Sequence, residues 1–218
     1  MTWNWHFAWR VLPVLLRGLL VTLEATGAGM ILALVIGLIW AVMVRSGKFW
    51  LVWPARAIVE FVRNTPLLIQ LFFLYYVMPE FHVQMSALAT GMVALGINYS
   101  AYTAEVYRAG LENIPRGQRD AARALNIPGG WTFRDIIFPQ ALAPMIPALG
   151  NNLIAMFKDT PLLSTITVGE MLQKALVVGD TTFHYLEPLT MVGVLFLLVS
   201  LVSSFLIGLF ERYAGLRS

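Results

Sequence analysis

Apolar residues gather in five long segments of the chain, and polar stretches separate these segments. The segments cover residues 18–43, 65–79, 86–104, 137–157 and 188–210. The second segment extends backward to about residue 58, and Glu24 is the one charged side chain inside the first. Membrane-spanning strands are shorter, at about ten residues, and alternate apolar with polar positions. The pattern therefore predicts five helices.

The lengths of these segments suit a membrane. A helix needs roughly 20 apolar residues to cross the hydrocarbon, and only helices or closed barrels satisfy every backbone polar group in lipid. The composition agrees, because 58% of the residues are hydrophobic and only 12% are charged, whereas about a quarter are charged in a soluble domain. The sequence predicts an all-α, polytopic membrane protein, with five transmembrane helices in a single domain over residues 1–218.

Lysine and arginine are distributed unevenly between the polar connections. The connections after the first, third and fifth segments hold Arg45, Lys48, Arg56, Arg63, Arg108, Arg116, Arg119, Arg123, Arg134, Arg212 and Arg217. The opposite side keeps only Arg10, Arg17 and Lys174, with Lys158 at a helix end. Because cytoplasmic connections carry the excess of these cations, we expect the amino terminus outside and the carboxyl terminus in the cytoplasm.

The connection over residues 111–138 is too long for a simple turn and has a helical character. Residues 120–125 are a run of good helix formers. Asn126 suits the left-handed conformation that ends a helix, and the Pro-Gly-Gly of residues 128–130 prevents continuation. Thr132 is a suitable N-cap for a second short helix. We predict two short helices joined at a sharp bend and projecting into the cytoplasm; the alternative is a solvated loop that only sets topology.

Particular residues of this connection form a recognisable motif. They are Asp120, Ala121, Ala122, Asn126, Ile136, Phe138 and Pro139. In identity and spacing they resemble the EAA motif of the membrane subunits of ABC importers, E-A-A-x3-G-x9-I-x-L-P, with Asp for Glu, Asn for Gly and Phe for Leu. Residues 61–79, 102–118 and 157–171 resemble the polar amino acid branch of these permeases. The resemblance covers nearly the whole chain.

The resemblance implies a permease subunit in the cytoplasmic (inner) membrane of a prokaryote. Such a subunit pairs with a second copy or a homologue, sits on two cytoplasmic ATP-binding cassette ATPase subunits, and receives solute from an extracytoplasmic binding protein. The sequence has no G-x-x-x-x-G-K-[ST] phosphate loop, so ATP and Mg are expected on the ATPase. We expect this chain to contact the lipid bilayer and to bind no cofactor, metal ion or nucleic acid.

The resemblance also implies that the connection couples the permease to the ATPase. The residues expected to do so are Arg119, Asp120, Ala121, Ala122, Arg123, Asn126, Ile136 and Pro139. Small side chains at Ala121 and Ala122 would allow close packing against the ATPase. The arginines either pair with carboxylates of the ATPase or only hold the connection inside the cell.

Polar groups inside apolar spans are costly, which makes them candidates for function. On the third predicted helix, Asn98, Tyr102 and Glu105 fall at i, i+4 and i+7, which is one face. An amide, a phenol and a carboxylate there could contact a zwitterionic solute. Alternatively, Asn98 and Tyr102 hydrogen-bond between helices, and Glu105 pairs with Arg108.

The fourth predicted helix ends in the charged residues Lys158 and Asp159. These two side chains could hold opposite ends of a zwitterion or could neutralise each other, and Asn151 is a further candidate with packing as its alternative. A straight helix places the pair about 30 Å beyond Pro139, at the outer boundary. Two prolines and a glycine in residues 144–150 can break the helix and draw the pair deeper.

Other classes of membrane protein and the identity of the solute stay open at this point. A secondary transporter usually shows internal repeats, a channel needs a filter loop, and a membrane enzyme needs a catalytic cluster; none is recognisable. The resemblance implies a polar or charged amino acid as solute. Residues 1–13, Asn126 and residues 157–171 are most similar to permeases for ectoine and hydroxyectoine, which are cyclic zwitterions.

Smaller features complete the predictions. Trp3, Trp5 and Trp9 precede the first predicted helix and are interpreted as an interfacial aromatic belt. Thr65-Pro66 is expected to start or kink the second helix. Two glycines in residues 27–29 are expected to allow close approach of a neighbouring helix.

Overall fold

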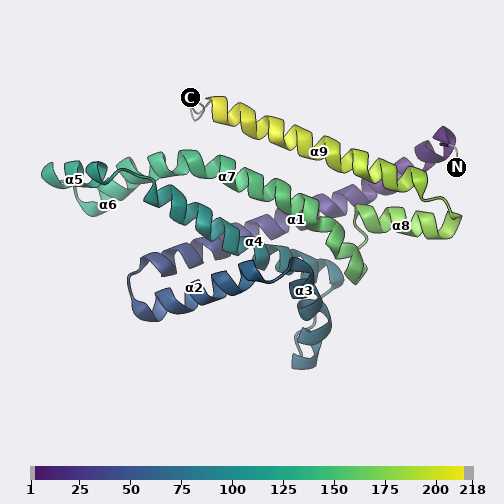
Figure 1. Cartoon of the computed structure of the whole chain (residues 1–218), viewed down its shortest axis with the longest axis horizontal. Coiled ribbons are helices and arrows are strands. Elements are labelled where there is room, and N and C mark those ends of the chain that lie inside the picture. The colour runs from purple at the N-terminus through teal and green to yellow at the C-terminus, as the bar shows by residue number, and fades with distance from the viewer. Residues whose placement is uncertain (1–2, 214–218) are drawn as a thin grey trace.

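In the computed structural model, residues 3–213 are described, and every regular element among them is a helix or a helical turn (Figure 1). The α-helices are α1 (Trp5–Arg45), α2 (Phe49–Asn64), α3 (Leu67–Phe72), α4 (Ala87–Glu112), α5 (Arg116–Ala124), α6 (Gly129–Trp131), α7 (Phe138–Asp159), α8 (Met171–Thr182) and α9 (Leu186–Tyr213). Between them lie the π-helical turns Phe73–Val77 and Thr132–Ile137 and the 3-10 turns Met78–Phe81 and Thr160–Ile166. The all-α prediction is confirmed for the described residues, whereas Arg217 lies outside them.

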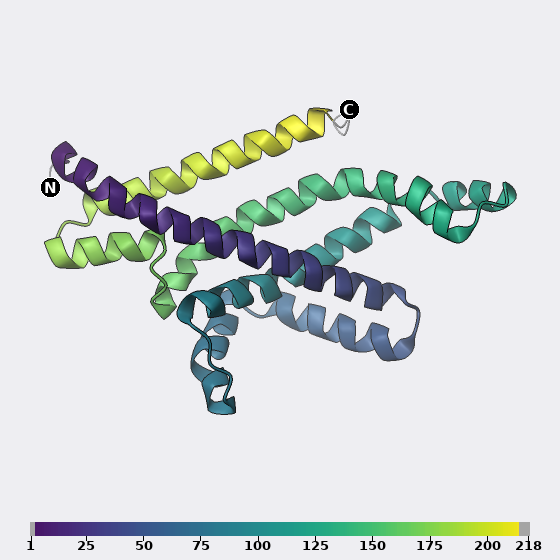
Figure 2. The ribbon, with the colours of Figure 1, turned by 180° about the vertical axis from the view of Figure 1, so that it is seen from behind.

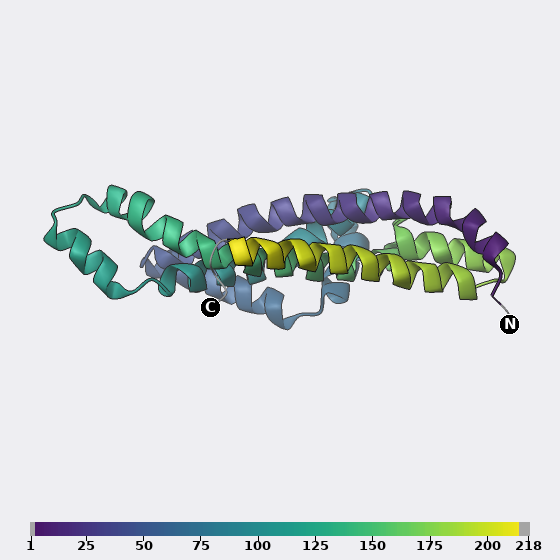
Figure 3. The same ribbon diagram turned by 90° about the horizontal axis from the view of Figure 1, so that it is seen from above.

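The helices form an elongated bundle with two different ends (Figures 1 and 3). The loop end carries α5 and α6 and, closer to the middle, the turn between α1 and α2, whereas the N-terminal end carries the amino terminus and α8. Both α1 and α9 start at the N-terminal end and run toward the loop end, and α7 runs in the opposite direction (Figure 2). The connection over residues 111–138 therefore lies far from the amino terminus, as its predicted topology requires.

Two helices, α1 and α9, are long and apolar enough to cross a membrane by themselves. Two further candidate spans are bent pairs of helices. One joins α2 to the segment Leu67–Phe81 with a bend of 105°, and the other joins the segment Gly129–Ile166 to α8 with a bend of 45°. By length and composition, the described chain has two to four candidate spans, so the count of five is not confirmed.

The helix α4 is not among these candidates, and its surroundings explain why. It packs against α1, α2, α3 and α7, and its buried side chains include Asn98, Ser100 and Thr103. The Thr103 hydroxyl donates a hydrogen bond to the Ala33 carbonyl oxygen of α1 at 2.8 Å. A helix that contacts protein rather than lipid can carry such polar groups, because neighbouring helices satisfy them.

Glycines allow α1 and α4 to approach each other closely. A Cβ added at Gly96 would lie 2.6 Å from Cβ of Leu32, and one added at Gly37 would collide with Thr103. Of the two glycines expected to permit a close approach, Gly29 does so, because an added Cβ would lie 3.1 Å from Cβ of Leu95. Gly27 has no such neighbour within 4 Å in this chain.

The Gly37→Ala variant is expected to be less stable than the parent protein. Its methyl group has no space beside Thr103, and overpacking of this kind costs about 1–3 kcal/mol. Thermal unfolding of the purified protein in detergent measures the effect. Gly27→Ala makes the same chemical change on the same helix where no atom lies within 4 Å, so its unfolding temperature should equal or exceed the parent's, because alanine is the better helix former. Equal unfolding temperatures for the two variants would contradict the packing of α1 on α4.

The first helix begins earlier than its apolar segment. Asn4 caps it, accepting a hydrogen bond from the Phe7 backbone N–H at 3.1 Å, and the helix starts at Trp5. Trp5 and Trp9 therefore lie within α1, and the prediction that they precede the helix is wrong. Both indoles are exposed, as in an interfacial belt.

The second apolar segment contains a sharp bend instead of one straight helix. α2 ends at Asn64, and Thr65 and Pro66 have extended conformations, because the ring of a proline disfavours helical geometry in the residue before it. The prediction that Thr65-Pro66 starts or kinks a helix is confirmed. The Gln70 side chain holds the bend by donating hydrogen bonds to the carbonyl oxygens of Val62 and Thr65 at 2.8 and 3.1 Å.

The fourth apolar segment is one unbroken helix, so the alternative in which its prolines and glycine break it is wrong. α7 continues through Pro144 and Pro147, and its packing against α1, α4 and α9 compensates for the backbone hydrogen bonds that the prolines remove.

The helix α8 was not predicted. Glu170 caps it, accepting hydrogen bonds from the backbone N–H groups of Leu172 and Gln173 at 2.8 and 2.6 Å.

Candidate functional site

The connection between α4 and α7 is a helical hairpin that projects from the loop end of the bundle (Figures 1 and 3). α5 ends at Ala124, and Asn126 has a φ of 54°. The backbone N–H of Ile127 donates a hydrogen bond to the Ala122 carbonyl oxygen at 3.0 Å, which closes the helix end. The predicted left-handed residue at Asn126 is confirmed.

The N-cap of the second helix of the hairpin lies four residues earlier than predicted. α6 starts at Gly129, directly after Pro128, which occupies the N-cap position. Thr132 is not a cap, since its hydroxyl donates hydrogen bonds to the carbonyl oxygens of Ile127 and Pro128 at 3.3 and 3.2 Å. A proline at the helix entry fixes the extended geometry that an N-cap needs, which explains the earlier start.

The inner face of the hairpin holds α5 against the segment Thr132–Ile137. Ala122 lies on this face and is 2% exposed, and Thr132 and Ile137 are buried beside it in the same part of the chain. Since Ala122 is covered by the hairpin itself, its small side chain sets how closely α5 packs within the hairpin. Ala121, the next residue along α5, is exposed.

The outer face of the hairpin presents large apolar side chains. Leu125 is 74% exposed and Trp131 is 61% exposed. With Asn126 and Ile136, two of the predicted coupling residues, they line a hollow of about 430 Å³. Exposed apolar side chains that surround a hollow are typical of a surface that another protein covers.

The other predicted coupling residues lie around this face. Arg123 and Asp120 approach to 3.8 Å and are both well exposed, so their interaction contributes little to folding. The Arg119 guanidinium lies 3.5 Å from a backbone carbonyl oxygen of α4. Pro139 is exposed in the first turn of α7.

Polar side chains of α4 and α7 meet inside the bundle. The Tyr99 hydroxyl donates a hydrogen bond to a carboxylate oxygen of Asp159 at 2.7 Å. The next residue toward the amino terminus, Asn98, is 5% exposed and donates from Nδ2 to the side-chain Oε1 of Gln70 at 3.3 Å. Two of the predicted solute residues, Asn98 and Asp159, thus take part in neighbouring contacts that join α4 to α3 and α7.

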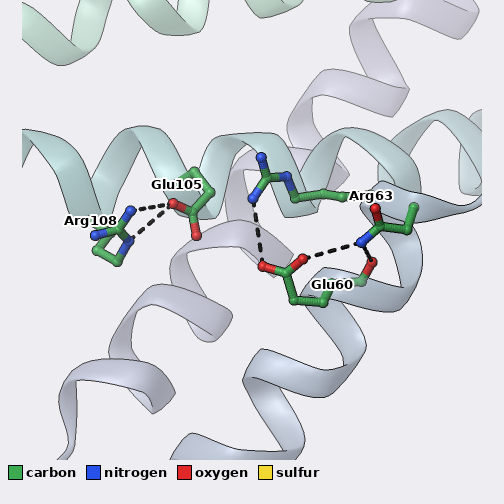
Figure 4. Close-up of polar contacts among 5 residues, drawn as sticks. Glu60, Arg63, Glu105 and Arg108 are labelled. Carbon is green, nitrogen blue, oxygen red and sulfur yellow. Dashed lines mark hydrogen bonds and ion pairs between the residues drawn. The ribbon is translucent and has the colours of Figure 1, made fainter.

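The other two candidates on α4 differ in their neighbours, because the Tyr102 ring centre lies 5.7 Å from that of Tyr99, whereas Glu105 pairs with an arginine. Glu105 accepts hydrogen bonds from Arg108 at 2.6 and 3.0 Å (Figure 4). Arg108 also donates a hydrogen bond to Glu112 at 2.6 Å. The alternative in which Glu105 pairs with Arg108 is therefore confirmed. Tyr102 is partly exposed, and the guanidinium carbon of Arg63 lies 5.9 Å from the centre of its ring.

The candidates on α7 also separate in the structure. Asp159 points to Tyr99, whereas Lys158 is exposed, and the described ion pairs include none between these two neighbours. Asn151 is exposed as well. By contrast, the side-chain amide nitrogen of the adjacent Asn152 is buried and has no hydrogen-bond partner in the described part of the chain.

A charged cavity of about 500 Å³ lies between α1, α2 and α4, toward the loop end. Its charged lining residues are Arg45, Arg56, Glu60, Arg63, Glu105, Arg108 and Glu112. Glu60 and Arg63 approach to 3.8 Å across one turn of α2 (Figure 4). Over residues 3–213, no three histidine, aspartate or glutamate side chains are grouped as a metal site would need.

Sequence reasoning missed Tyr99, Gln70, Leu125 and Trp131 as parts of these sites. Tyr99 and Gln70 are polar residues inside apolar segments, which is a usable signal. Leu125 and Trp131 are large apolar residues in a polar connection, and that contrast could also have identified them. The signal alone does not say which neighbour each side chain meets.

Known transport proteins are similar to this chain over most of its length. The model of a family described as "Binding-protein-dependent transport system inner membrane component" matches residues 33–214. The probable amino-acid ABC transporter permease protein y4tG of Sinorhizobium fredii is 49% identical over 201 residues, which are 92% of this chain and 87% of that protein. The arginine transport system permease protein ArtQ of Bacillus subtilis is 32% identical over 202 residues, covering 92% of each chain.

A solved structure is similar over almost the whole chain. It is described as the crystal structure of an amino acid ABC transporter with histidines, and it superimposes with a TM-score of 0.93 at 33% sequence identity. The superposition covers 98% of this chain and 100% of that one. The descriptions of these three proteins name amino acids, and none of them names ectoine.

Proposed function

Because the chain belongs to the family of binding-protein-dependent transport system inner membrane components, we propose that it moves a polar amino acid or a related zwitterion into the cell. It is a membrane permease subunit and not an enzyme, as its relatives are permease proteins. ATP and Mg are then bound, and ATP is hydrolysed, by partner ATPase subunits. The proposal places the protein in the cytoplasmic membrane of a prokaryote.

The observation that carries this proposal is the hairpin at the loop end. It projects beyond the apolar helices (Figure 3), has a fixed bend at Asn126, and exposes Leu125 and Trp131. A rigid element with an apolar outer face can transmit movement from an ATPase to α4 and α7, which flank it in the chain. Two ATPase subunits would bind two such hairpins, one from this chain and one from a second permease subunit, identical or homologous.

The orientation proposed for the chain follows from its cations. The loop end carries the arginines of residues 116–134, so it faces the cytoplasm, and the N-terminal end faces the binding protein outside. Counting α1, the bent pair containing α2, α4, α7 and α9 as one crossing each gives five crossings. α4 then crosses inside the protein, shielded from lipid by its neighbours.

Cysteine labelling in whole cells is expected to confirm this orientation. The native chain contains no cysteine, so each introduced thiol is the only one in the permease. A cysteine at Gly130 should react with a membrane-impermeant maleimide only after the cells are opened, whereas a cysteine at Gln84 should react in intact cells. Both positions are exposed, so burial would not mask either thiol. The reverse pattern would overturn the orientation and the coupling function of the hairpin.

The proposed solute site lies at Asn98, Tyr99 and Asp159. Asp159 provides a carboxylate inside the bundle with only one described hydrogen bond, from Tyr99, and a carboxylate oxygen pair can accept several more. An ammonium group of a zwitterion would satisfy it. Tyr102 and Glu105 lie on α4, the helix of Asn98 and Tyr99, closer to the loop end. The solute would pass them after it leaves this site.

The solute proposed first is an α-amino acid, supported by the descriptions of the relatives with 49% and 32% identity. Ectoine is the finer alternative, supported by the resemblance of residues 1–13 and 157–171. Uptake of radiolabelled amino acids and of ectoine into vesicles with the assembled transporter and its binding protein tests both. ATP-dependent uptake of an amino acid that ectoine does not compete for supports the first, and the absence of ATP-dependent uptake of any zwitterion would contradict the proposal.

A further inference from the structure

The cavity between α1, α2 and α4 carries more positive than negative charge. Its lining has four arginines and three glutamates. Arg108 contacts both Glu105 and Glu112 at 2.6 Å, and Arg63 approaches Glu60 at 3.8 Å (Figure 4). All three carboxylates are therefore occupied by two of the arginines.

The remaining arginines of the cavity are Arg45, at the end of α1, and Arg56, on α2. Neither takes part in an ion pair within the described part of the chain, and both side chains are exposed. Topology requires cations on this side of the membrane, but it does not require two unpaired guanidinium groups to line one cavity. Such a pair is suited to a phosphate, which guanidinium groups bind in a bidentate manner.

Exposed aromatic side chains lie at the start of α2, before Arg56 of the cavity lining. Trp50 is 84% exposed, Trp53 is 66% exposed and Phe49 is 65% exposed. The ring centre of Phe49 lies 6.1 Å from that of Trp50 and 6.4 Å from that of Trp53. Trp53 is one helical turn from Arg56, so the aromatic cluster and the cation are neighbours on the helix surface.

We propose that this cavity binds the headgroup of an anionic phospholipid, with Arg45 and Arg56 contacting its phosphate. The cluster of Phe49, Trp50 and Trp53 then packs against the first part of the acyl chains. Anionic headgroups attract such cations at a membrane surface, and tryptophan is enriched at the depth of the headgroups. A soluble phosphate would explain the arginines but not the exposed aromatic cluster.

Native mass spectrometry of the detergent-purified transporter complex tests the proposal. The complex is incubated with phosphatidylglycerol or phosphatidylcholine, and the retained lipid is measured. The parent complex should retain phosphatidylglycerol preferentially. Each of the variants Arg45→Gln and Arg56→Gln should weaken that retention about fivefold. Arg116→Gln removes a positive charge on the same side, outside the cavity, and should retain phosphatidylglycerol like the parent.

Two further measurements separate the lipid from other occupants. Trp53→Ala should reduce retention of phosphatidylglycerol and leave competition by glycerol phosphate unchanged, because only the chains contact the indole. Equal retention of the two lipids by the parent, or undiminished retention of phosphatidylglycerol by the Arg45→Gln, Arg56→Gln double variant, would overturn the proposal. Loss of the ATPase from that double variant with unchanged lipid retention would also overturn it, and would assign the cavity to the ATPase.

Discussion

Replacement of Leu125 by aspartate is expected to abolish ATP-driven uptake while the permease still inserts and folds. Leu125 is 74% exposed at the outer face of the hairpin, so a polar side chain there does not disturb the interior of the protein. At a protein–protein contact, burying an uncompensated carboxylate at a central apolar position costs about 2 kcal/mol or more. Binding of the ATPase should weaken by at least about 30-fold, measured by co-purification and by uptake into proteoliposomes.

The matched control for this prediction is Arg123→Gln on the same short helix. Its side chain makes one exposed ion pair with Asp120, which is worth about 0.2–1 kcal/mol, so uptake should fall fivefold at most. The prediction fails if Leu125→Asp binds the ATPase normally, or if Arg123→Gln is as inactive as Leu125→Asp. The second result would indicate that charge, and not the apolar face, holds the ATPase.

The bend of the hairpin could be predicted, but the direction of its faces could not. Asn126 follows a run of helix formers and precedes a proline, so local backbone preferences determine its left-handed conformation. Whether Ala122 faces the ATPase or the hairpin depends on how α5 packs against the segment Thr132–Ile137. That packing is a tertiary contact, and a local sequence pattern contains no information about it.

The break in the second apolar segment could likewise be predicted from the local sequence, whereas its geometry could not. Thr65-Pro66 predicts a break because of the steric effect of the proline ring on the residue before it. The size of the bend, 105°, is maintained by Gln70, whose amide bridges back to the end of α2 and also meets Asn98. Gln70 and Asn98 are 28 residues apart in the chain, so their contact was not accessible from the local sequence.

The candidate solute residues on α4 illustrate a further limit. Periodicity groups Asn98, Tyr102 and Glu105 on one face, yet the contact with α7 is made by Tyr99, one residue further along the helix than Asn98. The pattern named Asp159 as a candidate for the solute, but it did not indicate that Asp159 contacts α4. It could not choose the face, because the rotation of α4 is set by tertiary packing, such as the close approach of Gly96 to Leu32 of α1.

Replacement of Asp159 by asparagine is expected to weaken solute uptake about tenfold or more while leaving the complex intact. The two side chains have the same shape, and the amide oxygen can still accept the hydrogen bond from Tyr99, so α4 and α7 stay joined. What is lost is the charge for the ammonium group, and one charge-assisted hydrogen bond is worth about 1.5–3 kcal/mol. The measurement is the apparent affinity for uptake, normalised to the assembled complex.

Two other variants make the Asp159 result specific. Glu80→Gln removes an exposed carboxylate outside the bundle core and should transport like the parent, because it changes net charge without touching the site. Tyr99→Phe removes the hydrogen-bond donor of Asp159 but keeps its charge, so its effect on affinity should be smaller than that of Asp159→Asn. If Asp159→Asn assembles normally and has the parent's affinity whereas Glu105→Gln has lost it, the ammonium group is held at the loop end of α4, and Asp159 only joins two helices.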